Sequence, residues 1–144
     1  MFSKTCEYAI RAMIFIAQKT KEGDIRIGIK DIASGIDSPE YFIAKILQEL
    51  SRKGLVQSVK GPNGGFYLDH SSLQQSLADV VRAVDGDKIF EGCGLGLKQC
   101  SEKCPCPIHH DFKRIRKDLY RTLEKSKLGN FTEELDKQLL FLRR

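Results

Sequence analysis

Apolar residues recur at helical spacing near the start of the chain. A helix over about Thr5 to Thr20 is predicted by one apolar face, which consists of Ala9, Ala12, Met13 and Ile16. Either Thr5 or Ser3 is expected to cap this helix. The residues from Lys21 to Asp24 are then expected to form a turn, and a short extended piece follows at Ile25 to Ile27.

The next pattern predicts two helices separated by a turn. The first covers Lys30 to Ser34, with a glycine directly after it. The second is expected to have Ser38 as its N-cap, Pro39 as its first helical residue and Glu40 beside its positive end. It runs to Lys53, and its apolar face consists of Phe42, Ile43, Ile46, Leu47 and Leu50. This is the pattern of a helix-turn-helix, whose second helix is the candidate for the DNA major groove.

A hairpin is predicted directly after these helices. Its strands are expected at Leu55 to Lys60 and at Phe66 to Leu68, and its turn consists of Gly61, Pro62, Asn63, Gly64 and Gly65. A hairpin in this position is the winged-helix arrangement. The glycines allow the backbone to approach a phosphate or a groove closely, and Lys60 lies at the base of the wing, where it can meet phosphate.

Three more helices are predicted after the wing. The first starts with Ser76 as N-cap and Asp79 as its capping-box partner. The second is long, from about Asp111 to Lys127, and carries a narrow apolar seam of Phe112, Ile115, Leu119 and Leu123. Such a seam suits a partner helix in a second subunit, although it can also pack on its own domain. The third is a short helix from Thr132 to Leu142 that presents Leu135, Leu139 and Leu142.

The segment from Cys93 to His109 contains four of the five cysteines and shows no helix or strand period, so a loop is predicted. Thiolate and imidazole are ligands of zinc and of iron–sulfur clusters, which favours a metal or cluster site. One alternative is a set of redox-active thiols, in which Cys100, Cys104 and Cys106 are close enough in sequence for disulfide exchange. The other is a purely structural loop. The fifth cysteine, Cys6, is expected to be a small buried or half-buried residue, with a ligand or disulfide role as the alternative.

Composition narrows the class of protein. The 144 residues allow one domain with a core, and the net charge of +5 permits a nucleic-acid partner without requiring one. No apolar run approaches the ~20 residues that span a bilayer, and the N-terminus lacks a signal-peptide pattern. We therefore expect a cytoplasmic protein without membrane contact. No acid–base constellation accompanies the cysteines, so an enzyme is not expected.

Four segments resemble the Rrf-two family of bacterial winged-helix regulators. They are Glu7 to Ala12, Ile43 to Leu50 with Gly54 to Val56, Lys60 to Phe66, and Val81 to Gly86. With the cysteine loop they cover the chain, in order, from near its start to His109. The resemblance implies a homodimeric transcription regulator that binds double-stranded DNA at a pseudo-palindromic operator.

The resemblance also implies a cofactor. In cluster-bearing members three loop cysteines hold an iron–sulfur cluster, and the residues that look like those three are Cys93, Cys100 and Cys106. His109 matches the histidine ligand of the family's cluster assembly regulator. Glu7 lies near the position of the acid that the partner subunit supplies in the nitric-oxide sensor. Cys104 is additional, and the gap before Cys100 is one residue longer than in the best-known members. Cys104 and Glu7 are therefore alternate ligands, and the cluster is expected to be [2Fe–2S] ahead of [4Fe–4S].

The start of the second helix of the helix-turn-helix is expected to reach base edges, since recognition helices use that end. The residues concerned are Ser38, Pro39, Glu40 and Tyr41. Glu40 can accept a hydrogen bond from cytosine or simply stabilise the first helical turn. Lys45, Arg52 and Lys60 are expected to contact phosphate, although Lys45 also suits an ordinary solvated position. The wing, Gly61 to Gly65, would lie against the backbone or the minor groove.

The predicted fold is mainly α with a small β hairpin. It comprises a winged helix-turn-helix DNA-binding domain at residues 1–86, a cysteine-rich cluster-binding loop at 87–110, and a dimerisation helix with a C-terminal helix at 111–144. The predicted function is a homodimeric DNA-binding transcription regulator whose DNA affinity an iron–sulfur cluster controls in response to redox, nitric oxide or iron–sulfur status. The alternatives are a cluster-free thiol-redox or small-ligand-responsive repressor on the same fold, and an electron-transfer iron–sulfur protein. No catalytic residues are predicted.

Overall fold

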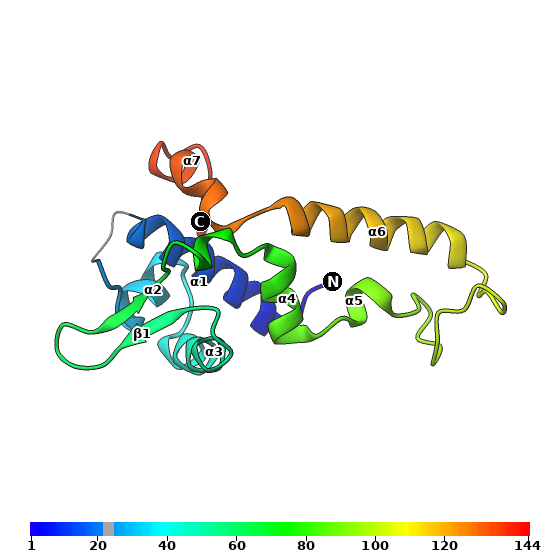
Figure 1. Ribbon diagram of the computed structural model, residues 1–144, viewed down its shortest axis with the longest axis horizontal. Helices are drawn as coiled ribbons and strands as arrows, with labels where there is room; N and C mark the ends of the chain where they lie inside the picture. The colour runs from blue at the N-terminus through cyan, green and yellow to red at the C-terminus, as the bar shows by residue number, and fades with distance from the viewer. Residues whose placement is uncertain (22–24) are drawn as a thin grey trace.

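Helix α1 (Lys4–Thr20) runs through the body of the molecule and is contacted by later helices and by the C-terminal segment (Figure 1). The structure is a computed structural model and describes residues 1–21 and 25–144. Ser3 Oγ accepts a hydrogen bond from the Cys6 backbone N–H at 3.0 Å, so Ser3 caps the helix. The apolar face is buried as predicted. Beyond Lys21, the expected turn to Asp24 lies outside the described residues.

Helices α2 (Ile29–Gly35) and α3 (Glu40–Arg52) form the predicted helix-turn-helix. The predicted start of α3 is wrong, because Pro39 is the N-cap rather than the first helical residue. Ser38 caps nothing: its hydroxyl is buried and has no hydrogen-bond partner within the described ranges. The physical reason is that the Ser38 N–H donates to the Ala33 carbonyl at 2.9 Å, which keeps Ser38 in the preceding turn.

Strands β1 (Gln57–Val59) and β2 (Gly65–Tyr67) pair antiparallel and form the predicted wing. Ile27 joins the wing by a bridge to Phe66, with N–H···O distances of 2.8 and 2.9 Å. Gly65 lies beside this bridge with φ +147°, and a Cβ there would be 2.7 Å from the Ile27 carbonyl oxygen. A side chain at this position would therefore collide with the bridge. Helix-turn-helix and hairpin together make a mainly helical winged-helix fold.

Helix α4 (Leu77–Asp85) begins with the predicted capping box between Ser76 and Asp79. The apolar pattern does not predict the 3-10 turn η1 (Ser72–Gln74) or the short helix α5 (Lys88–Glu91). Helix α6 (His109–Lys125) starts ahead of the predicted Asp111 and lies along α5 (Figure 1). The loop between α5 and α6 lies at the end of the molecule away from the wing (Figure 1).

The apolar seam of α6 is divided between the core and solvent. Leu123 is buried and Leu119 is partly buried against the core, whereas Ile115 is 57% exposed. Arg116, on the same helix, is only 7% exposed. The seam thus packs partly on its own chain, which was the alternative to a purely intersubunit seam.

The C-terminal segment returns to α1. The 3-10 turn η2 (Leu128–Phe131) and helix α7 (Thr132–Asp136) both contact α1. The predicted helix as far as Leu142 is wrong in length, because Gln138 adopts φ +57° and turns the chain. Leu139, beyond this turn, is exposed. The division of the chain into three domains stays a prediction. Among the described residues, no helix is long and apolar enough to cross a bilayer.

Candidate functional site

The N-terminal half of α3 presents aromatic and charged side chains to solvent. Tyr41 is 66% exposed, and Phe42 is 49% exposed although the apolar pattern placed it on the buried face. Phe42 is held at the surface by stacking with Tyr8 of α1, at 6.2 Å between ring centroids. The Lys45 ammonium lies 5.2 Å from the centroid of the Tyr41 ring. Glu40 is exposed beside them, so this end of α3 is accessible to a ligand.

The remaining predicted phosphate contacts lie at the far end of α3 and on the wing. Arg52 forms an ion pair with Glu49, so part of its charge is already neutralised on the helix. Lys60 is exposed at the start of the wing turn. Within the turn, the Gly64 N–H donates to the Gly61 carbonyl at 2.9 Å. The exposed backbone of the turn is therefore held in one shape beside an available cation.

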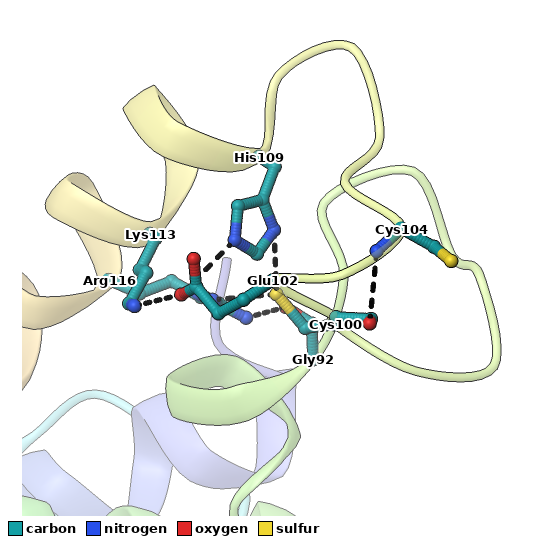
Figure 2. Close-up of polar contacts among 8 residues, drawn as sticks. Gly92, Cys100, Glu102, Cys104, His109, Lys113 and Arg116 are labelled. Atoms are coloured by element: carbon teal, nitrogen blue, oxygen red, sulfur yellow. Dashed lines mark hydrogen bonds and ion pairs between the residues drawn. The ribbon is translucent and has the colours of Figure 1, made fainter.

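The cysteine loop brings the predicted ligands together as two pairs. The sulfurs of Cys93 and Cys106 are 3.8 Å apart. Cys100 Sγ lies 3.4 Å from His109 Nδ1 (Figure 2). Cys104 is exposed, and its sulfur points away from His109 (Figure 2). All five cysteines of the chain are free thiols.

Positive charge and backbone N–H groups surround the sulfurs. Arg116 donates to Cys100 Sγ at 3.1 Å and also to the Gly92 carbonyl. The Leu95 N–H lies 3.4 Å from Cys93 Sγ, and this contact is the main reason why the pKa of the Cys93 thiol is lowered. Backbone N–H groups favour the thiolate of Cys93, and thiolate is the form that binds metals. Arg116 was not among the site residues predicted from the sequence.

His109 is buried at the start of α6, with 3% exposure. Its second ring nitrogen, Nε2, lies 3.3 Å from Oε1 of Glu102 (Figure 2). Glu102 pairs with Lys113, which is the main cause of its lowered pKa, and the contact with His109 adds to it. The donor atoms of Glu102, His109 and His110 all lie within 4.8 Å of one another. No spacing signal in the sequence identifies Glu102.

Two other predicted residues lie away from the loop. Glu7 lines a surface pocket with Phe2, Arg11 and the C-terminal residues, so a single chain does not bring it to the cysteines. Cys6 is fully buried, and burial, with the nearby charge of Asp85, raises the pKa of its thiol to about 12. Cys6 is thus the buried residue that the sequence predicted.

A helix-turn-helix followed by a wing, with cations and aromatic rings exposed on its second helix, is the architecture of a winged-helix DNA-binding regulator. The family model Rrf2, described as an iron-dependent transcriptional regulator, matches residues 2–134. The chain therefore belongs to the Rrf2 family, the Rrf-two family that its motifs resemble. Rrf2 regulators bind DNA, function as dimers and are transcription regulators rather than enzymes.

Individual proteins agree with this assignment. The chain is 32% identical over 129 residues to the HTH-type transcriptional regulator NsrR of Geobacillus kaustophilus, covering 89% of this chain and 86% of that protein. Its fold resembles that of T. potens IscR, with a TM-score of 0.74 and 21% identity, over 97% of this chain and 91% of that chain. It also resembles CymR, the global cysteine regulator of B. subtilis, with a TM-score of 0.73 and 22% identity, over 92% and 96% of the two chains. These likenesses confirm the predicted winged-helix fold.

Proposed function

We propose that an iron–sulfur cluster, held by Cys93, Cys100, Cys106 and His109, controls the DNA affinity of this regulator. The observation that carries the proposal is the pairing of the loop cysteines with one another and with the first residue of α6, Cys93 with Cys106 and Cys100 with His109. Thiolates and imidazole are the ligands that such clusters take. The family's description as iron-dependent supports the same chemistry.

The chain's own residues prepare the donors for this role. The Arg116 guanidinium donates a hydrogen bond to Cys100 Sγ, and the Leu95 N–H donates one to Cys93 Sγ. A bound cluster would supply a group that responds to oxidants or nitric oxide. Cys104 is turned outward, so we propose His109 as the fourth ligand. Glu7, on α1, is an alternative only if the partner subunit supplies it.

We propose that DNA contacts come from both ends of α3 and from the wing. Pro39, Glu40 and Tyr41 would reach base edges, and the wing at Gly61 to Gly65 would lie against the backbone. Lys45, Arg52 and Lys60 would neutralise phosphates. Ser38 is left out of the base contacts because its hydroxyl is buried.

Side-chain contacts connect the cysteine loop to α3, the second helix of the helix-turn-helix. Phe90 of α5 meets Tyr120 of α6 edge-on at 5.2 Å between ring centroids. Arg82 of α4 lies 5.0 Å from the centroid of the Tyr120 ring. One residue further along α4, the Ala83 carbonyl accepts a hydrogen bond from the ammonium of Lys53, directly after α3. A change in the loop would thus alter α6 and α4 and so the setting of α3.

The test begins with anaerobic purification of the full chain, followed by an absorption spectrum and iron and sulfide assays. Wild type should show visible charge-transfer bands with matching iron and acid-labile sulfide, and Cys93→Ala should lose them. Cys104→Ala is the matched control and should keep them. The iron content distinguishes the expected [2Fe–2S] cluster from a [4Fe–4S] cluster. A colourless wild type that also fails reconstitution would refute the proposal.

DNA binding is then measured with and without the cluster, on operator and unrelated duplexes at several salt concentrations. A change in specific affinity on cluster loss is expected. Equal affinities for the operator in both states would mean that the cluster does not control binding.

A second candidate is a thiol switch on the same fold, favoured by the 3.8 Å separation of the Cys93 and Cys106 sulfurs. Hydrogen peroxide would take two electrons and two protons from these thiols, leaving a disulfide and two molecules of water. Iron-free protein should then change its DNA affinity on oxidation, and dithiothreitol should reverse the change. Cys93→Ser should abolish the response, and a response that survives in this variant would refute the pairing.

A further inference from the structure

The two ring nitrogens of His109 face different partners. Nδ1 lies 3.4 Å from Cys100 Sγ, on the side of the sulfur donors. Nε2 lies 3.3 Å from Oε1 of Glu102, as Figure 2 shows. His109 is 3% exposed, so its ring is largely shielded from water. Nε2 is buried and forms no hydrogen bond in the described part of the chain, so the Glu102 carboxylate is an acceptor within reach of an otherwise unpartnered nitrogen.

Glu102 is itself held in place from α6. The Lys113 ammonium pairs with the same oxygen, Oε1, that faces His109 (Figure 2). Lys113 follows His109 by one helical turn, so both residues project from the same face of α6. The first turn of α6 therefore fixes the carboxylate relative to the imidazole, even though Glu102 comes from an irregular loop.

We propose that Glu102 is the positioning residue for His109. Its carboxylate accepts the Nε2–H of the neutral imidazole, which leaves the Nδ1 lone pair directed at the sulfur donors. A ligating histidine usually donates its other N–H to a carboxylate or carbonyl, which fixes both the tautomer and the ring orientation. The assignment of a ligand role to His109 rests on the proposed function, whereas the tautomer does not.

A divalent cation held by Glu102, His109 and His110 is the competing use of the same atoms. The Lys113 ammonium on the Glu102 carboxylate opposes it, because a cation bound there would meet a like charge. Positioning of His109 also explains why the buried Nε2 points at an acid, while the exposed ring of His110 needs no partner.

The first test needs no cluster. Nitrogen-15 NMR of the histidines is recorded on the full-length, cluster-free protein under anaerobic conditions at about pH 8, above the usual imidazole pKa. Wild type should hold His109 as the Nε2–H tautomer. Glu102→Gln should keep it, because the amide oxygen still accepts, and Glu102→Ala should shift the population toward Nδ1–H.

Glu91→Gln is the matched control, because it removes a carboxylate that lines the same pocket from α5; this variant should leave the His109 tautomer as in wild type. An Nδ1–H tautomer in wild type, or an unchanged tautomer in Glu102→Ala, would overturn the assignment.

The second test measures cluster retention against an iron chelator in reconstituted protein. Loss of a carboxylate partner of a ligating histidine typically weakens metal binding ~10–100-fold, and Glu102→Ala should show a loss of that order. Glu102→Gln should stay closer to wild type. Equal retention in Glu102→Ala and wild type would overturn the role. If wild type takes up no cluster, the proposed function fails, while the NMR experiment still decides whether Glu102 sets the tautomer.

Discussion

Gly65 in the wing offers a prediction whose size follows from the structure. Replacing it with alanine puts a Cβ 2.7 Å from the Ile27 carbonyl oxygen at a residue with φ +147°. The backbone strain costs about 1–3 kcal/mol. The collision also breaks the two hydrogen bonds between Ile27 and Phe66, at about 0.5–1.5 kcal/mol each. Gly65→Ala should therefore lower the free energy of unfolding by about 2–6 kcal/mol.

Gly61→Ala is the matched control for this prediction. Gly61 also has a positive φ, +106°, but nothing lies within 4 Å of a Cβ built on it. In this variant only backbone strain should lower the free energy of unfolding, by about 1–3 kcal/mol. Denaturant unfolding at one fixed protein concentration measures both values, since a dimer's stability depends on concentration. Equal losses in the two variants would refute the close approach of Ile27 to the wing. DNA affinity should fall further in Gly65→Ala, because the wing loses its anchor.

Four further predictions concern single side chains. The pKa of Asp136 is lowered mainly by Lys21; this pair stabilises the fold above the usual carboxyl pKa and the effect is lost as pH falls through the folded pKa. In denaturant titrations, Asp136→Asn should thus be less stable than wild type at neutral pH and equally stable in acid. A difference in the free energy of unfolding that stays the same at both pH values would contradict this. Ser76→Ala breaks the capping box and should lower the free energy of unfolding by about 0.5–2 kcal/mol in the same titrations. An unchanged denaturant midpoint would argue against this role of Ser76. Lys45→Gln should reduce the salt slope of DNA binding by about 1, and an unaltered slope would exclude a phosphate contact. Cys6, with a raised thiol pKa, should resist alkylation until the protein unfolds; rapid labelling of the native protein would refute its burial.

Periodic elements were predictable because burial and helical spacing reinforce each other. Helices α1, α3, α4 and α6 all have an apolar face, and the wing has a glycine turn between strands. Local hydrogen bonds decided the details that failed. Ser38 is a good N-cap residue, yet its N–H is bound to Ala33, so the helix begins after it. The helix ending at Asp136 was predicted too long because nothing in the pattern marks the positive φ of Gln138.

The candidate site was predictable as a set of donors, but its supporting residues were not. The clustered cysteines and the histidine indicated a metal or cluster site, and the resemblance to the Rrf-two family then pointed to Cys93, Cys100, Cys106 and His109. One sequence signal could have identified Arg116, because it lies four residues after Phe112 and three before Leu119, on the face of the apolar seam. No sequence signal could have identified Glu102, because its approach to His109 depends on the path of an irregular loop.

The pairing of donors at the base of the loop bears on how this protein can vary among its relatives. Cys93 and Cys106 close the loop where it leaves α5 and approaches α6, while Cys100 is held by His109 and Arg116. The segment between Cys93 and Cys100 bulges outward and turns at Gly96, where φ is +76°. Insertions and deletions in that bulge would therefore change its contour without moving a sulfur. The exposed bulge is thus the part of the loop where the additional residue before Cys100 can be accommodated while the sulfur positions stay the same.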